Sequence, residues 1–267
     1  MRSSRLALAL ALVLAASPSS AAWVAVGTIL NANNGSAAAS WAPVTSATLE
    51  AGNVAVCVLA KDETGTGTTD SACGQSTTTT DAAGNTWIRF IEWCNMQTST
   101  AENGATVSIW LTSATTQLTS GAAITFNFSA STTRKAATCM EFTATHSSYA
   151  GAFNVLSNDA ADPGSLTTTT LQVREHLFIR GIGCESNVTT YTADTDYIAF
   201  TGQGAASTSD SGTAATSMGA RGEYRIATEA VSAASDPTYA TADCASAMTS
   251  LNEGCATRRA LTGVGCR

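Results

Sequence analysis

Residues 53–60 read NVAVCVLA, and this short apolar run decides the fold. Side chains of an extended strand alternate between its two faces, so a strand with one wet face shows alternating polarity. Here both faces are apolar, and the first is built from β-branched residues. The first face carries Val54, Val56 and Val58, and the second carries Ala55, Cys57 and Leu59. The run therefore predicts a central strand that is buried on both sides.

Comparable segments recur along the chain with turn residues between them, and no long stretch shows a helical period. Met140 and Phe142 are expected to point inward and Glu141 outward. The Ala-rich run at 245–251 has some helical character, and we interpret it as the closing strand. The expected strands are 23–30, 53–60, 85–93, 105–111, 123–128, 136–144, 175–183, 197–201, 222–228 and 245–251.

Many short strands with polar connections predict an all-β fold, an antiparallel β-sandwich that is jelly-roll-like. We expect residues 23–253 to form a single β-sandwich domain, because no linker divides the chain. Residues 64–80 and 202–220 are rich in Thr, Gly, Ser and Ala, and are expected to be long polar loops. Loops of this kind cluster at the ends of a sandwich and often carry binding.

The first 22 residues have the layout of a secretory signal peptide that is removed. Arg2 and Arg5 precede an apolar run at 6–16, and small residues follow at 17–22. The run is about half of the roughly 20 residues that a membrane-spanning helix needs, so no stable membrane anchor is expected. This pattern predicts an extracellular or cell-surface protein.

Eight cysteines fit an oxidising compartment, because an even number behind a leader predicts disulfides. Two pairings have a local reason. Cys73–Cys94 would close a polar loop, and Cys255–Cys266 would close the C-terminal tail at 254–267. The pairing of the remaining cysteines is not determined by the sequence, since eight cysteines can pair in many ways. These cysteines are Cys57, Cys139, Cys184 and Cys244. No C-x-x-C spacing is present, so no metal site is expected.

The charge balance argues against nucleic acid as a partner. The formal net charge is −7, and of the 13 basic residues only Lys61 and Lys135 are lysines. An acidic, lysine-poor surface repels phosphate backbones. The abundance of Thr and Ser in place of Lys and Glu is typical of secreted and virion β proteins.

The sequence contains no recognisable catalytic motif, so we expect neither an enzyme nor a bound cofactor. There is no G-x-S-x-G sequence, and neither histidine, His146 or His176, lies beside a nucleophile motif. No Gly-rich phosphate loop opens a helix. Four glutamates on separate predicted strands are expected to point into solvent: Glu92, Glu141, Glu175 and Glu223.

Tryptophans offer flat apolar faces on which sugars can stack. Trp87, Trp93 and Trp110 lie on predicted strands, where packing is the commoner role. Trp41 lies outside the predicted strands and is therefore the candidate glycan contact. A secreted carbohydrate-binding module is accordingly the alternative function, ahead of a secreted hydrolase.

A series of short motifs gives a resemblance at the level of a family. The order of these motifs resembles β-sandwich modules of bacteriophage and prophage structural proteins and of bacterial surface proteins. The resemblance implies a module for assembly or attachment, with no catalytic residues to carry over. The leader and the cysteines depart from a virion protein assembled in a reducing cytoplasm and favour an exported version. The motifs lie at 51–56 (AGNVAV), 81–87 (DAAGNTW), 105–110 (ATVSIW), 118–121 (LTSG), 162–164 (DPG) and 220–226 (ARGEYRI).

These observations predict an exported, non-enzymatic structural or adhesive subunit of an extracellular filament, cell surface or virion-like assembly. Its expected partners are copies of itself or other surface or virion proteins, with glycans as the alternative. In a filament, the segment at 23–30 would pair with a neighbouring sheet edge by strand addition. The residues expected at this interface are Trp23, Val24, Val26 and Ile29.

Overall fold

The structure is a computed structural model of the whole chain. It describes residues 23–65, 69, 71–96, 104–144, 153–158, 164–168, 175–185, 191–201, 217–227, 233–239 and 244–252. The predicted leader at 1–22, the tail at 254–267 with Cys255 and Cys266, and His146 lie outside the described residues. Predictions about those segments therefore stay predictions.

The described residues form strands and connections, with no helix among them, which confirms the all-β class. The N-terminal strands are β1 (Trp23–Asn34), β2 (Ala38–Trp41), β3 (Val54–Asp62), β4 (Ser76–Asp81), β5 (Trp87–Cys94), β6 (Ala105–Ser113), β7 (Ile124–Thr132) and β8 (Lys135–Ala144). The C-terminal strands are β9 (Phe153–Asn158), β10 (Leu166–Thr167), β11 (His176–Cys184), β12 (Tyr191–Thr192), β13 (Ile198–Ala199), β14 (Gly219–Ala227), β15 (Ala234–Ser235), β16 (Thr238–Tyr239) and β17 (Cys244–Asn252).

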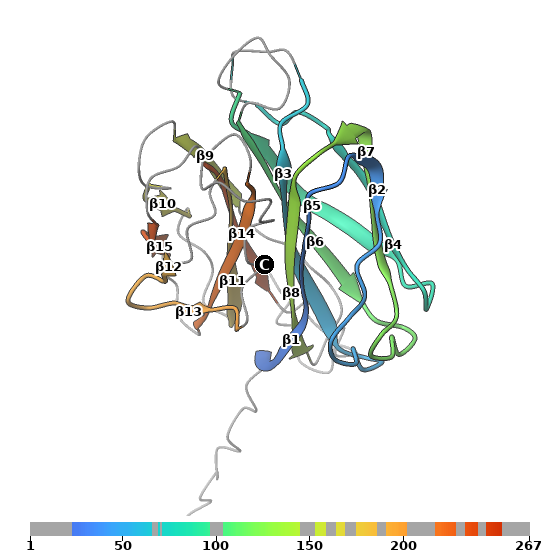
Figure 1. The fold of residues 1–267 in the computed structure, drawn as a ribbon. Coiled ribbons are helices and arrows are strands. Elements are labelled where there is room, and N and C mark those ends of the chain that lie inside the picture. Colours follow the sequence, from blue (N-terminus) through green and yellow to red (C-terminus); the bar gives the residue numbers. More distant parts are fainter. Residues whose placement is uncertain are drawn as a thin grey trace, which may run out of the picture.

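The main strands are arranged in three antiparallel sheets that stack as layers (Figure 1). The central sheet has the order β1-β8-β3-β6-β5. One face is covered by a five-stranded outer sheet, β13-β14-β11-β17-β9, and the other by a three-stranded outer sheet, β2-β7-β4. A sandwich of two sheets encloses one hydrophobic core between its layers, whereas these three layers enclose two.

Strand β3 lies in the middle of the central sheet, and every one of its nine residues is buried. Val54, Val56 and Val58 pack into the core against the five-stranded sheet. The opposite face packs into the core against the three-stranded sheet, through Ala55, Cys57 and Leu59. The predicted two-sided burial of this strand is confirmed, and its cause is a covering layer on each side.

The five-stranded sheet approaches the central sheet closely where β11 has glycines in place of larger side chains. A Cβ atom on Gly181 would lie 3.0 Å from Val58 Cγ1. A Cβ atom on Gly183 would lie 2.9 Å from the Cβ of Ala60 and 3.1 Å from the carbonyl oxygen of Thr106. Glycine in a strand often marks such a close approach of two backbones.

Several expectations from the sequence are wrong because the three-stranded sheet adds a third layer over the central sheet. Residues 76–80, expected in a loop, belong to β4, which pairs with β7 in the three-stranded sheet. Glu141, expected to face solvent, is only 2 % exposed because the face of β8 opposite Phe142 is also covered. Its Oε1 accepts hydrogen bonds from Glu50 N at 2.9 Å and from Asn53 Nδ2 at 2.6 Å. The run at 245–251, with its competing helical pattern, is strand β17 as predicted.

Replacing Gly183 with alanine tests the close contact between the sheets. We expect Gly183→Ala to lower the free energy of unfolding by about 1–3 kcal/mol, because the added carbon overpacks the core. Ser40→Thr is the matched control, since it adds one carbon at an exposed strand position. Chemical denaturation of both variants measures the difference. Equal stability of the two would contradict the close approach.

Candidate functional site

The described histidine, His176, and three of the four glutamates lie in the interior of the protein. His176 is 2 % exposed, and its ring lies 5.7 Å from that of Phe178, measured between centroids. Contrary to the prediction of solvent exposure, Glu92, Glu141 and Glu223 are all buried. Each of the three accepts hydrogen bonds from backbone or side-chain donors, so each acts as a structural acceptor.

Strand β1 forms one edge of the central sheet and pairs with β8 of the same chain. The four residues predicted at the strand-addition interface divide into two kinds. Trp23 and Ile29 are each 1 % exposed and belong to the two cores. Val24 is 49 % exposed and Val26 is 53 % exposed. The exposed valines, and not the whole segment, are therefore available to a partner.

The outer edge of β1 is only partly open. Bulges interrupt its pairing with β8 between Ala25 and Gly27 and between Thr28 and Leu30. Ser46 N donates to the carbonyl oxygen of Ile29 at 2.8 Å, which occupies one acceptor of the edge. Bulges of this kind protect natural edge strands from uncontrolled pairing. Any partner strand would therefore meet a short stretch of edge near Val24 and Val26.

A groove of about 480 Å³ runs beside this edge, between β1 and the β13–β14 side of the five-stranded sheet. Ile198, which is 57 % exposed, lines it together with Val24. Asp196 and Arg225 also line it and form an ion pair at 3.2 Å. The groove thus combines exposed aliphatic side chains with one charged pair, as protein-binding surfaces commonly do.

A second groove, of about 500 Å³, lies between β4 and β5. Four consecutive threonines at 77–80 line one side, and Trp87 and Arg89 line the other. The indole nitrogen of Trp87 donates to Asp81 Oδ2 at 2.9 Å, which fixes the ring at the groove wall. The exposed threonine hydroxyls of this groove are the groups that could bind a sugar, since the Trp87 ring is only 8 % exposed.

Trp41, the predicted glycan contact, is 9 % exposed and belongs to the core beneath the three-stranded sheet. Its ring centroid lies 5.9 Å from that of Phe126. A ring packed in this way presents no open face to a sugar. Its burial therefore argues against the glycan contact, and the β4–β5 groove is the better location for one.

Three disulfides are present among the described cysteines, and they include the predicted Cys73–Cys94 pair. Cys57–Cys139 joins the directly opposed residues of β3 and β8, and Cys184–Cys244 does the same for β11 and β17. These two pairings follow from the sheet order, which sequence spacing does not contain. One disulfide therefore fixes the central sheet and one fixes the five-stranded sheet.

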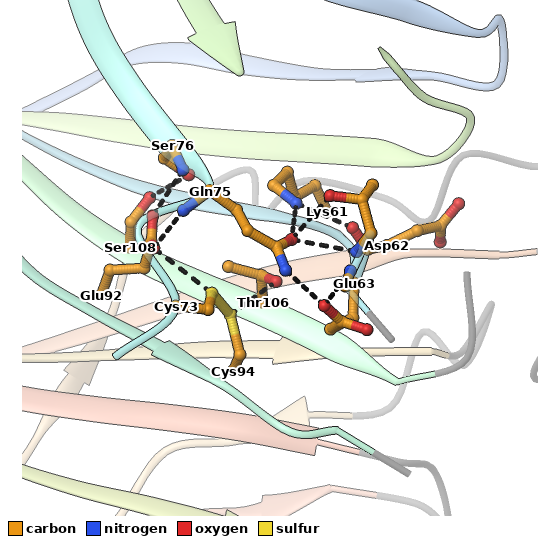
Figure 2. The surroundings of a disulfide bond; sticks show 12 residues. Lys61, Asp62, Glu63, Cys73, Gln75, Ser76, Glu92, Cys94, Thr106 and Ser108 are labelled. Carbon is orange, nitrogen blue, oxygen red and sulfur yellow. Dashed lines mark hydrogen bonds between the residues drawn. A yellow bond between two sulfur atoms is a disulfide. The ribbon is translucent and has the colours of Figure 1, made fainter. Parts of the chain in front are cut away.

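Glu92 lies next to the Cys73–Cys94 disulfide and holds the start of β4 in place (Figure 2). Its carboxylate oxygens accept hydrogen bonds from the backbone nitrogens of Gln75 and Ser76, both at 2.7 Å, and Arg89 lies 3.2 Å away. Cys73, Glu92 and Cys94 are close enough to hold a metal ion. With the disulfide formed, however, the two sulfurs are no longer thiolates, which are the ligands that metals bind.

A second buried polar cluster lies on the outer face of the five-stranded sheet. Arg180 donates to the carbonyl oxygen of Gly164 at 2.5 Å, and Glu223 accepts from Tyr191 Oη at 2.7 Å. Burial and the neighbouring Glu223 raise the pKa of Tyr191 well above its ordinary value. These bonds attach the connections around β10 and β12 to the sheet. Arg180 and Glu223 are far apart in the sequence, so the sequence does not reveal that they form a cluster.

Comparison with known proteins adds no relative: the chain matches no protein-family model, no curated protein and no solved structure. The resemblance to phage and bacterial surface modules stays a prediction. Within the described ranges, no helix is long and apolar enough to cross a membrane.

The disulfides should differ in their resistance to reductant. Cys73 is partly exposed, whereas the residues of the other two disulfides are at most 1 % exposed. We expect dithiothreitol to open Cys73–Cys94 first in the folded protein, because thiol–disulfide exchange requires access to a sulfur atom. Trapping with iodoacetamide followed by mass spectrometry gives the order. Simultaneous opening of all three would contradict this burial pattern.

Proposed function

We propose that the protein is an exported, non-enzymatic structural or adhesive subunit that associates with copies of itself at the β1 edge. The observation that carries the proposal is the pair of exposed valines, Val24 and Val26, on an edge strand beside an open groove. Disulfides are consistent with an oxidising compartment, and the leader-like sequence supports export. A surface or virion-like assembly accounts for both features.

A second copy is the occupant that this edge fits best. An exposed sheet edge offers hydrogen-bonding groups that another strand can satisfy, and apolar side chains beside it add burial. In the single chain β1 pairs with β8, so it would accept a neighbouring strand and would not have to leave its own sheet. The edge near Val24 and Val26 is thus the proposed contact.

Charged residues at this edge should prevent association without unfolding the chain. We expect the double variant Val24→Lys, Val26→Lys to lose assembly while its circular dichroism stays unchanged, since both side chains are exposed. Val44→Lys is the control, because Val44 is 60 % exposed and lies elsewhere, at a bridge to Ala123. Sedimentation and electron microscopy of the mature protein measure assembly. A strictly monomeric wild-type protein that binds no surface would refute the proposal.

The β4–β5 groove favours a carbohydrate-binding module as the second candidate function. Its threonine hydroxyls and the Arg89 guanidinium supply the hydrogen-bonding groups that commonly contact sugars, whereas Trp87 is 8 % exposed and belongs to the same core as Trp41. Thr80 and Thr86 are both exposed at this groove. Association through β1 and sugar binding here use different surfaces, so one molecule has room for both.

Removing groove hydroxyls tests this second function. We expect Thr80→Val with Thr86→Val to weaken binding on a glycan array by about tenfold, a change that one or two lost hydrogen bonds can produce. Thr192→Val removes a hydroxyl from an exposed site on β12 and serves as the control. A wild-type protein that binds no glycan on the array would remove the support for this function.

A further inference from the structure

The side chain of Gln75 lies between a buried amine and a buried carboxyl group (Figure 2). Lys61 Nζ donates to Gln75 Oε1 at 2.5 Å, and Gln75 Nε2 donates to Glu63 Oε1. Gln75 is 6 % exposed, and the other two residues are completely buried. Lys61 is the second-last residue of the central strand β3, whereas Gln75 immediately precedes β4 of the three-stranded sheet.

Among the described residues, no carboxylate lies within ion-pair distance of the buried ammonium group of Lys61. Its nitrogen donates to two neutral oxygens, Gln75 Oε1 and the carbonyl oxygen of Asp62 at 2.9 Å. No ion pair of Lys61 occurs in the part of the chain that the structure describes. An unpaired charge in a protein interior is strongly unfavourable. The site therefore favours a state in which this nitrogen carries no charge.

Desolvation lowers the pKa of Lys61 to about 8, and the opposing effects of Glu92, Glu63 and Asp62 do not offset it. An uncharged amine is a nucleophile, so a reactive form of Lys61 is accessible near neutral pH. The carbonyl carbon Cδ of Gln75 lies within about 3.7 Å of Nζ, because a C=O bond adds only about 1.2 Å to the hydrogen-bond distance. This separation is close to that of reacting atoms in a near-attack arrangement.

Glu63 supplies the group that can move a proton. One carboxyl oxygen, Oε1, accepts the hydrogen bond from Gln75 Nε2. The other, Oε2, is buried and has no hydrogen-bond partner among the described residues. This oxygen is therefore available to take up a proton. The carboxyl group touches the nitrogen that would leave Gln75.

We propose that Lys61 and Gln75 become joined by an intramolecular isopeptide bond. Nζ of Lys61 attacks Cδ of Gln75, the Cδ–Nζ bond forms, and the Cδ–Nε2 bond breaks. The proton lost by Nζ passes through the Glu63 carboxyl group to the departing nitrogen, which leaves as ammonia. No electrons are transferred and no co-reactant is consumed. The product is a neutral secondary amide in place of a buried charge.

The bond would tie two layers of the structure together independently of redox conditions. Lys61 and Gln75 are 14 residues apart, and the nearby Cys73–Cys94 disulfide joins the same segment to β5. Reduction opens the disulfide but leaves an amide intact. A chain with the isopeptide bond would keep β4 attached to the central sheet in a reducing medium.

Peptide mapping of the full-length wild-type protein tests the proposal. After reduction and alkylation, trypsin should fail to cleave after Lys61, and the peptide that continues to Arg89 should be lighter by the mass of one ammonia molecule. Fragmentation should place the link between Lys61 and Gln75. Wild-type protein that is fully cleaved after Lys61, at the unmodified mass, would overturn the proposal. So would an ammonia loss located at an Asn-Gly pair such as Asn34-Gly35.

Variants separate the roles of the three groups. Lys61→Arg and Gln75→Met should each retain the full mass, and Glu63→Gln should slow the loss of ammonia at least tenfold. Lys135→Arg is the matched control, because Lys135 is the other buried lysine and lies opposite Lys61 on β8. It should leave the link intact. In freshly refolded wild-type protein, the reaction should accelerate as the pH rises toward 8, since the uncharged fraction of Lys61 increases about tenfold per pH unit below its pKa.

Discussion

Burial of both faces of the central sheet is the constraint on which the rest of the structure depends. Strand β3 has no polar face, so a sheet on one side only would leave Ala55, Cys57 and Leu59 in contact with water. The three-stranded sheet covers that face, and the five-stranded sheet covers the other. Two cores then share one sheet, and each outer sheet is held in position by the same strands.

The same constraint explains the polar groups inside the protein. A sheet that is covered on both sides also buries the charged residues at the ends of its strands, such as Lys61, Asp62 and Lys135. Buried polar groups must find hydrogen-bond partners, and the connecting segments between strands provide them. Glu92 holds the start of β4 in this way, and Arg180 holds the segment around Gly164. Connections are therefore fixed by charges that sequence reasoning would place in solvent.

A strand can be predicted from the sequence when its polarity pattern lies entirely within that strand. The prediction fails when pairing or packing with a neighbouring strand determines the structure. The apolar alternation of 53–60 is sufficient to predict β3 as a buried strand. The STTTTD sequence of β4 has no apolar face, so only its pairing with β7 makes it a strand. Glu141 is polar in an alternating segment, and its burial depends on a third layer that the alternation does not reveal. Likewise, Cys57–Cys139 and the contact between Lys61 and Gln75 follow from which strands are neighbours.

The placement of the lysines has a practical consequence for work with this protein. The sequence contains only Lys61 and Lys135, and both side chains are fully buried in the fold. Amine-directed reagents such as succinimidyl esters and aldehydes would therefore find no lysine on the folded surface. Fluorophores or supports are better attached through carboxyl groups or an introduced cysteine, and lysine-specific proteases should leave the folded domain uncut.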